Sequence, residues 1–401
     1  MEWKEVKLSE LGDIVGGATP STKEPLNYDG DISWITPKDL STFSERYISK
    51  GERSITKKGF ESCSCKMLPE GSILFSSRAP IGYVAIAKNE LCTNQGFKSV
   101  IPNKKKVDNI FLFYLLKHNK NRIENLGSGT TFKEVSGSVM KDVKVRVPSL
   151  EDQIKIASIL SSLDAKIENN NKINANLEAQ AQALFKSWFI DFEPFQNGEF
   201  EDSELGRIPK GWKVGTLKDI AIINPTLKLS KSQDATYLDM KNMPTSGSFP
   251  NKWEIKPYNG GMKFQNGDTL MARITPCLEN GKVAYVNFLK EDEVGFGSTE
   301  YIVIRPKNGI FPELFYFLCR YNDFVGYATK NMNGSSGRQR VSAETIGNYK
   351  MIIPPINILL ELAPLFSSIM NIIRVNGFKN IYLSTLRDTL LPKLMSGEIE
   401  V

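Results

Sequence analysis

The feature that most constrains the fold of this 401-residue sequence is an internal repeat. Glu70-Gly71-Ser72-Ile73-Leu74-Phe75 is similar to Asn266-Gly267-Asp268-Thr269-Leu270-Met271, Ser99–Pro102 to Val303–Pro306, and Val147-Pro148 to Ile353-Pro354. The offset between matching positions grows from 196 at Gly71 and Gly267 to 206 at Pro148 and Pro354, which indicates loop insertions between shared core elements. The sequence therefore predicts two copies of one folded unit of about 200 residues.

Each copy has the same predicted order of elements. Short strands come first, in runs such as Ser72–Phe75, Tyr83–Ala87 and Tyr301–Ile304. A short apolar helix follows, capped by Asp108 in the first copy and opened by Pro312 in the second. A loop rich in Gly, Ser and Thr, a strand that ends at a proline, and a long helix complete the copy.

The two long helices are predicted from about 151 to 190 and over the C-terminal residues from 356, where Pro364 would set or bend the start. Their apolar residues recur at alternating spacings of three and four, which is typical of a coiled-coil seam. Asn170 and Asn174 interrupt the first seam, and the offset of 206 places Asn376 and Asn380 in the second. We expect the helices to pair antiparallel with Asn170 bonded to Asn376. The alternatives are two separate helices and solvated asparagines.

The predicted fold class is α+β, with two globular α/β domains separated by two long antiparallel coiled-coil helices. The expected boundaries are 1–150 for the first domain, 151–195 for the first helix, 196–210 for a linker, 211–355 for the second domain and 356–401 for the second helix. Both globular segments are basic, with net charges of +6 and +5, whereas 151–210 carries −5 and 356–401 is neutral. Basic domains suit a phosphate backbone, and the other segments suit protein partners.

Several classes of protein are disfavoured by what the sequence lacks. No apolar run approaches the length of a membrane span and no export signal opens the chain, so we expect a cytoplasmic protein. Cys63 and Cys65 have no further cysteine pair nearby, so we expect free thiols and no metal site. His118 is the single histidine, and no P-loop or amino-methyltransferase motif occurs. We therefore expect no catalytic residues.

The chain resembles the specificity subunits of type I restriction-modification enzymes over essentially its whole length. The resemblance rests on four segments in order: Gly71–Gly82, Pro148–Ile154 at the entrance to the first long helix, Trp188–Pro194 at its exit, and Leu390–Ile399 near the C-terminus. The second helix entrance departs from the pattern, because Ile358-Leu359-Leu360 stands where Glu-x-Gln would be expected.

The resemblance implies that each globular domain is a target recognition domain for one half of a bipartite site in double-stranded DNA. It also implies that the helices set the spacer between the halves and dock two methyltransferase subunits. Those subunits would carry S-adenosylmethionine, and restriction subunits could join. The chain itself would hold no cofactor.

Base edges are read by side-chain donors and acceptors, and loops are the expected carriers. The candidate DNA-binding residues are Lys38, Ser77, Arg78, Gln95, Thr130, Thr131 and Lys133 in the first domain and Lys241, Arg273, Thr275, Ser335, Arg338, Gln339 and Arg340 in the second. Each could instead be a solvated loop residue. Because the two Gly/Ser loops differ, the target is expected to be asymmetric, and replacing Arg338 and Arg340 should impair one half only. Two rival readings are a coiled-coil adaptor without DNA binding and the specificity subunit of a fused restriction-methylation enzyme.

Overall fold

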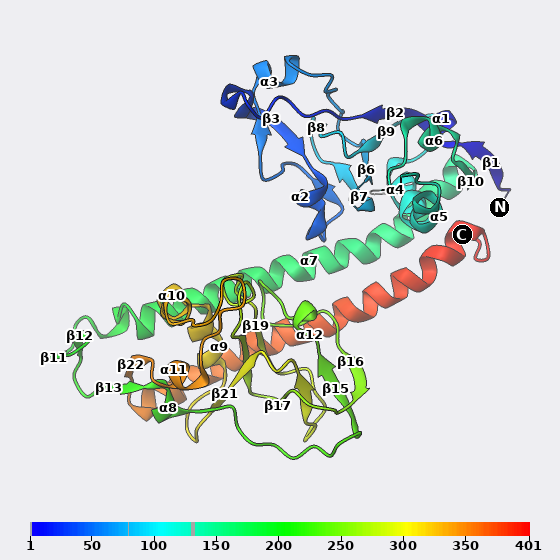
Figure 1. The fold of residues 1–401 in the computed structure, drawn as a ribbon. Helices are drawn as coiled ribbons and strands as arrows, with labels where there is room; N and C mark the ends of the chain where they lie inside the picture. The colour runs from blue at the N-terminus through cyan, green and yellow to red at the C-terminus, as the bar shows by residue number, and fades with distance from the viewer. Residues whose placement is uncertain (1, 79, 130–132) are drawn as a thin grey trace. The chain divides into compact units, whose positions relative to one another are not determined.

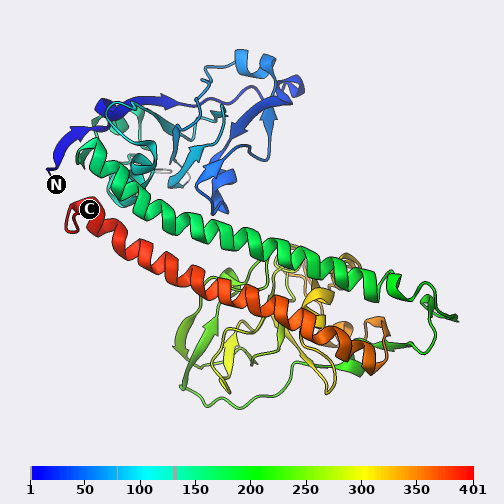
Figure 2. The ribbon, with the colours of Figure 1, turned by 180° about the vertical axis from the view of Figure 1, so that it is seen from behind.

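The computed structural model describes residues 2–78, 80–129 and 133–401. The chain forms two compact units. Unit 1 comprises the residues up to Glu168 together with Leu383–Val401, and unit 2 comprises Asn169–Tyr382. Both chain ends lie in unit 1 (Figures 1 and 2), where a Cβ added to Gly397 would come within 2.5 Å of the indole nitrogen of Trp3. The unit boundaries fall inside the two long helices, so each helix contributes to two cores.

Unit 1 contains a five-stranded sheet in the order β2-β9-β6-β7-β4 and a three-stranded sheet in the order β5-β3-β8. The pairs β4·β7 and β3·β8 are parallel, and a separate antiparallel pair, β1·β10, places Lys7 opposite Lys144. The strands are β1 Lys4–Lys7, β2 Gly12–Gly16, β3 Tyr28–Ile35, β4 Tyr47–Ile48, β5 Ser54–Ile55, β6 Ile73–Ser77, β7 Ile81–Ala87, β8 Cys92–Thr93, β9 Lys98–Pro102 and β10 Lys144–Val147.

The central helix of unit 1 is α4, whose residues Phe111–Leu116 are buried in the core. The predicted cap is confirmed, because the Asp108 carboxylate accepts a hydrogen bond of 2.8 Å from the backbone N–H of Phe111. The short helices of the unit are α1 Leu8–Leu11, a 3-10 turn Pro25–Asn27, α2 Pro37–Ser41, α3 Lys57–Glu61, α4 Asn109–His118, α5 Lys120–Asn125 and α6 Gly137–Asp142.

Unit 2 contains two four-stranded sheets, in the orders β14-β21-β18-β19 and β16-β15-β20-β17, and the pairs β13·β22 and β11·β12. The strands are β11 Phe200–Ser203, β12 Gly206–Pro209, β13 Lys213–Thr216, β14 Ala221–Ile223, β15 Asp234–Leu238, β16 Glu254–Pro257, β17 Met262–Phe264, β18 Thr269–Ala272, β19 Val283–Tyr285, β20 Gly295–Gly297, β21 Tyr301–Pro306 and β22 Lys350–Ile353. The short helices are Glu193–Phe195 and Met240–Asn242 (both 3-10), α8 Leu217–Ile220, α9 Glu313–Arg320, α10 Asn322–Lys330 and α11 Ala343–Gly347.

The two units share their strand connectivity. β2-β9-β6-β7 in unit 1 has the same order as β14-β21-β18-β19 in unit 2, and the pair β1·β10 has its counterpart in β13·β22. Matching turns precede β6 and β18, where Gly71 and Gly267 have φ values of +85° and +91°. Glycine suits these positions because a Cβ disfavours positive φ. The sequence motifs matched above therefore occupy matching places in the two units.

The two long helices are α7, Leu150–Phe189, and α12, Ile356–Ser396. Their predicted extents are confirmed, but α12 begins well before Pro364, so the proline does not set its start. The segment 196–210, which was expected to be a linker, has regular structure. Most of it forms the hairpin β11·β12, because Phe200 and Ile208 pack into the core of unit 2.

The helix α12 contains a longer apolar segment than we expected. By length and composition alone it could cross a membrane, with a mean hydropathy of 1.7 over its most apolar window, of which 28% is buried. One face packs into the core of unit 2 through residues such as Leu362 and Phe366. The other face leaves Leu360, Leu365 and Ile372 exposed. The expectation that no apolar segment approaches the length of a membrane span was therefore wrong for the most apolar window of α12.

Within unit 2, α7 and α12 run antiparallel and are joined by hydrogen bonds between asparagines, among them the four that the sequence singled out. The amide of Asn170 donates to Asn380 at 2.8 Å, and that of Asn376 donates to Asn174 at 2.8 Å. Asn170 and Asn376 are buried, with exposures of 2% and 9%. The predicted pair of Asn170 with Asn376 was wrong by one helical turn, because antiparallel helices pair residues whose numbers have a constant sum.

Replacing Asn376 by alanine should lower the free energy of unfolding by about 1 kcal/mol, because the buried amide of Asn376 no longer donates to the half-buried Asn174. Urea unfolding of the full chain measures the effect. The matched control is Asn176→Ala on the exposed side of α7, which reports the gain in helix propensity together with the loss of an exposed hydrogen bond from Gln180 on the same helix. Equal stabilities of the two variants would show that the asparagine pair does not stabilise the helix contact.

Candidate nucleic-acid interface

Loop B, defined as Asn333–Arg340, connects α10 to α11 in unit 2. Its base is closed by backbone hydrogen bonds of 2.9 Å in both directions between Asn333 and Arg340. The loop is also tied to the chain beyond β18, because the N–H of Thr275 donates to the carbonyl of Gln339 at 3.0 Å. Loop B is therefore a hairpin held beside the end of a central strand. The side chains at its tip, Ser335–Arg338, are exposed.

Loop A, defined as Gly127–Glu134, occupies the matching place between α5 and α6 in unit 1. Backbone hydrogen bonds of 3.0 Å and 2.9 Å join Ser128 and Glu134, and the next N–H, of Val135, donates to the carbonyl of Ser77 at 3.0 Å. In unit 2 the N–H of Val341 donates to the carbonyl of Arg273 at the same distance. The candidates Thr130 and Thr131 lie outside the described residues.

The last residue of each loop forms an ion pair with a residue in or next to a strand of its unit. The loop residue is acidic in unit 1 and basic in unit 2, and its partner has the opposite charge in each case. Glu134 of loop A accepts hydrogen bonds of 3.3 Å from Arg78 and from Lys98. Arg340 of loop B donates to Glu300 through Nε at 2.9 Å and Nη2 at 2.8 Å. The hydrogen bond from Arg340 lowers the pKa of Glu300 and raises that of Arg340. We call these contacts the base ion pairs, because they fix the loop bases to the sheets.

The unit 1 candidates differ in how far they can reach a ligand. Lys133 and Gln95 are exposed, and Gln95 accepts a hydrogen bond from Thr19. Lys38 is exposed and pairs with Glu52 at 2.7 Å. Arg78 belongs to the base ion pair. Ser77 was expected to reach DNA, but the structure buries it. Its side chain is 0% exposed, and its hydroxyl donates to the carbonyl of Gly96 at 3.2 Å.

The unit 2 candidates separate into free and engaged side chains. Arg338 is exposed at the tip of loop B, and Lys241 is exposed near Asp239. Arg273 is half-buried, and its Nε atom is buried without a hydrogen-bond partner among the described residues. The hydroxyl of Thr275 donates to a neighbouring glutamate at 3.1 Å. The guanidinium of Arg340 donates to Glu300, so this candidate also holds the loop.

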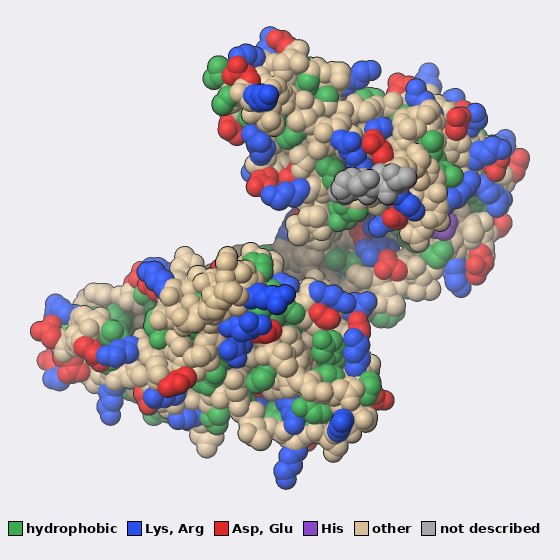
Figure 3. Space-filling view, viewed as in Figure 1, with side chains coloured by type: hydrophobic (Ala, Val, Ile, Leu, Met, Phe, Trp, Pro, Cys, Tyr) green, Lys and Arg blue, Asp and Glu red, His purple; other side chains and the backbone are tan. Residues whose placement is uncertain are grey.

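The two units also differ in surface charge. Figure 3 shows Lys and Arg side chains gathered on one face of unit 2, over the loops beside β19, whereas acidic and basic side chains are mixed on unit 1. An unpaired guanidinium beside a rigid loop is the arrangement that suits guanine recognition or phosphate contact. The geometry therefore favours loop B and Arg273 as a ligand-binding surface.

Comparison with known proteins decides the family. The family described as "Type I restriction modification DNA specificity domain" matches residues 1–179 and 209–382. The chain belongs to this specificity-domain family. It is 37% identical to the type I restriction enzyme MjaIX specificity subunit of Methanocaldococcus jannaschii, with 100% of the chain and 94% of the relative covered. It is 24% identical to the HindI specificity subunit of Haemophilus influenzae, with 99% of the chain and 100% of the relative covered.

A solved structure supports the fold of this specificity-domain protein. The crystal structure of the type I restriction-modification S subunit from M. genitalium superposes with a TM-score of 0.59 at 18% identity. The match covers 98% of this chain and 96% of that one. At this identity the comparison bears on the fold alone, and it agrees with a mixed α/β architecture that includes long helices.

Sequence reasoning missed the acidic halves of the base ion pairs. Glu134 and Glu300 were not among the candidates, and neither was Lys98 of β9. A signal was present, since the offset of 206 aligns Glu134 with Arg340, which are opposite in charge at one position of a repeat. When matching positions of a repeat carry opposite charges, their partners in the two copies are expected to carry opposite charges as well.

The described residues also bear on metal and acid–base chemistry. No group of three His, Cys, Asp or Glu side chains in 2–78, 80–129 and 133–401 is placed to hold a metal ion. His118 ends α4, where burial lowers its pKa. Cys63, Cys65 and Cys92 lie in one part of unit 1 as free thiols.

Proposed function

We propose that this chain is the DNA sequence-recognition subunit of a type I restriction-modification complex, and that loop A and loop B each read one half of a bipartite site. The observation that carries the proposal is the matching attachment of the two loops in a chain of the specificity-domain family. Both loops are closed by a backbone pair and tied to the end of a central strand. Rigid support matters because base readout needs donors and acceptors held in fixed geometry.

The proposed reading residues are the sequence candidates other than the buried Ser77 and the two arginines of the base ion pairs. Thr130 and Thr131 are carried over from the sequence, because they lie outside the described residues. In unit 2 they are Lys241, Arg273, Thr275, Ser335, Arg338 and Gln339, with Arg340 as the residue that positions the loop. In unit 1 they are Lys38, Gln95, Thr130, Thr131 and Lys133, with Arg78 in the positioning role. Because the two sets differ in charge and side-chain type, we infer an asymmetric target.

The domain arrangement is part of the proposal. Residues 1–150 and 211–355 would be two target recognition domains that arose by duplication, a view supported by their common strand order. The helices 151–195 and 356–401 would set the spacer between the half-sites. The paired asparagines support this role, because buried polar residues in a helix seam fix one register.

The proposed partners are two methyltransferase subunits, with restriction subunits as further members of the complex. The exposed apolar face of α12 supports protein docking, because contiguous exposed apolar surface marks interaction sites. S-adenosylmethionine would bind to the methyltransferase subunits, and this chain would contribute no catalytic residue. Its five cysteines are free, which suits the reducing cytoplasm.

Deleting the gene should remove adenine methylation from one asymmetric bipartite sequence throughout the host genome, and returning the gene should restore it. Single-molecule sequencing of methylated adenines measures both steps. A matched control restores the gene with Lys88→Met, a substitution of the exposed lysine that follows the last residue of β7. Unchanged methylation in the deletion strain would contradict the proposal.

The same experiment separates the alternatives. A coiled-coil adaptor that binds no DNA would leave the methylation pattern intact. The specificity subunit of a fused restriction-methylation enzyme would lose the same pattern, and the neighbouring genes would then decide. Separate modification and restriction genes indicate a type I complex, whereas a single fused gene indicates the other class.

A further inference from the structure

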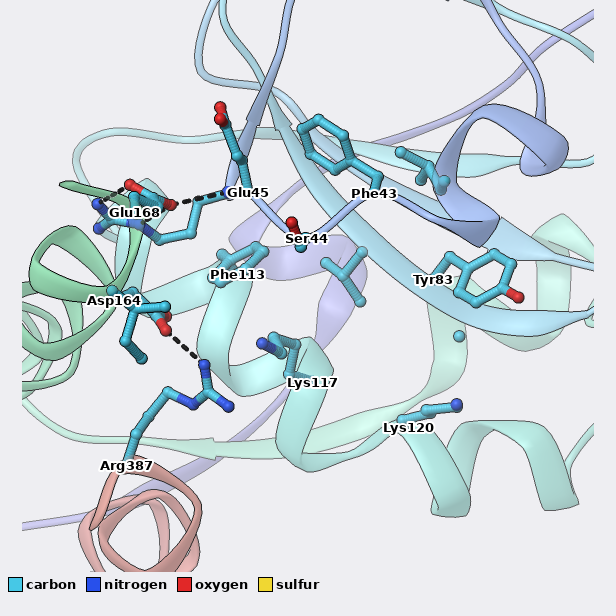
Figure 4. Close-up of a pocket in the computed structure, with 15 residues that line it drawn as sticks. Phe43, Ser44, Glu45, Tyr83, Phe113, Lys117, Lys120, Asp164, Glu168 and Arg387 are labelled. Carbon is cyan, nitrogen blue, oxygen red and sulfur yellow. Dashed lines mark hydrogen bonds and ion pairs between the residues drawn. The ribbon is translucent and has the colours of Figure 1, made fainter. Parts of the chain in front are cut away.

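Unit 1 contains a pocket of about 270 Å³ whose walls carry four cations (Figure 4). Arg46 follows α2, Lys117 and Lys120 lie on α4 and α5, and Arg387 lies on α12. The rest of the wall comes from the segment between Leu40 and Glu45, from Phe113, from β7 and from the part of α7 around Asp164. The charges of this pocket have no role in the attachment of loop A described above.

Two of the three acidic side chains in the wall, Glu168 and Asp164, already have partners. Glu168 accepts from Nε of Arg46 at 2.9 Å on one oxygen and from Nη2 at 2.9 Å on the other. Asp164 accepts from the hydroxyl of Tyr114 at 2.6 Å and from Nη1 of Arg387 at 2.5 Å. Each oxygen of these two carboxylates therefore accepts a hydrogen bond from a group other than the two lysines.

The two lysines remain without a partner. Among the described residues, neither ammonium group forms a hydrogen bond or an ion pair. Figure 4 shows the ammonium of Lys117 inside the pocket, and it lies 5.1 Å from the centre of the Phe113 ring. The exposed carboxylate of Glu45 points away from it. Burial lowers the pKa of Lys117 and outweighs the opposite effect of the nearby Asp164 carboxylate.

Lys120 is linked to the start of loop A through two residues of β7. The aliphatic stem of Lys120 lies over Gly82, where an added Cβ would come within 2.4 Å of it. The preceding residue, Ile81, lies against Gly127, the first residue of loop A. DNA supplies one negative phosphate at every step along each strand.

We propose that this pocket binds a phosphate group through Lys117 and Lys120, and that the group is a backbone phosphodiester of the DNA engaged by loop A. The assignment of the source rests on the proposed function. Free phosphate or a mononucleotide would present the same chemistry, so the test has one arm for each source.

The first arm measures DNA binding by the full chain in complex with its methyltransferase subunits over a range of KCl concentrations. Lys117→Met with Lys120→Met should weaken binding equally for cognate and unrelated DNA and should reduce the slope of log K against log salt by about one unit. Lys117→Arg with Lys120→Arg should restore the slope, and Lys88→Met should not change it. Lys117→Met alone should leave the thermal unfolding temperature equal or higher, because it removes an unpaired cation.

The second arm titrates the full chain with inorganic phosphate and with dAMP in a calorimeter, in the absence of DNA. An unchanged salt slope combined with phosphate binding that is lost in the double methionine variant would assign the site to a free phosphate ligand. An unchanged slope and no phosphate binding would overturn the proposal. If the wild-type complex binds no DNA, the proposed function fails, and the calorimetric arm still decides whether the pocket binds phosphate.

Discussion

Replacing Arg387 by alanine is expected to lower the free energy of unfolding by about 3 kcal/mol, because it leaves a buried carboxylate without its cation. Asp164 is 5% exposed, and the Arg387 side chain is 18% exposed. The hydroxyl of Tyr114 continues to donate to Asp164 in the variant, which keeps the loss near the lower end of the range for a broken buried ion pair. Urea unfolding monitored by far-ultraviolet circular dichroism measures the change.

Two matched variants test the cause. Lys393→Ala removes another cation of α12, one that pairs with Glu398 at the surface, and should change stability by no more than about 0.5 kcal/mol. Combining Asp164→Asn with Arg387→Met removes both charges and should recover most of the loss, because no uncompensated charge remains. If Arg387→Ala unfolds at the same urea concentration as Lys393→Ala, the pair does not hold α7 and α12 together in unit 1.

The repeat made much of the fold predictable. A motif that recurs at a slowly drifting offset marks elements that must pack in the same way, so β6 and β18, α4 and α9, and loops A and B could be placed before any coordinates. The long helices were equally accessible, because a seam of apolar residues over some forty positions leaves few alternatives. The four asparagines were located by the same offset.

What the sequence could not supply is the pairing between elements. Asn170 was matched to Asn376 and not to Asn380, because helical periodicity leaves the register of an antiparallel pair open by one turn. Ser77 was placed at the surface, but both faces of β6 are covered, so alternation of buried and exposed residues gave no guide. The ion pair of Arg340 with Glu300 was not predicted, because the two residues are forty positions apart in sequence and become neighbours only in the folded unit.

The second large effect is expected from the base ion pair of loop B. Arg340→Glu places an acidic side chain against Glu300, and the repulsion should detach the loop from the sheet. Methylation of the cognate site should then fall about tenfold or more, since contacts to one half-site are lost. Adding Glu300→Arg should restore methylation, because unit 1 shows that the opposite polarity, with Glu134 on the loop and Arg78 and Lys98 on the sheet, holds a loop in this place.

Arg338→Ala is the matched control for this exchange, because Arg338 lies at the exposed tip of loop B and takes no part in the base ion pair with Glu300. It should also impair recognition of one half-site, but adding Glu300→Arg should not repair it. Methylation of substrates that differ in one half-site at a time measures both effects. If the charge-exchanged double variant stays as impaired as Arg340→Glu, then Arg340 contacts DNA itself. If Arg340→Glu methylates normally, loop B does not read the target, and its resemblance to loop A reflects shared folding alone.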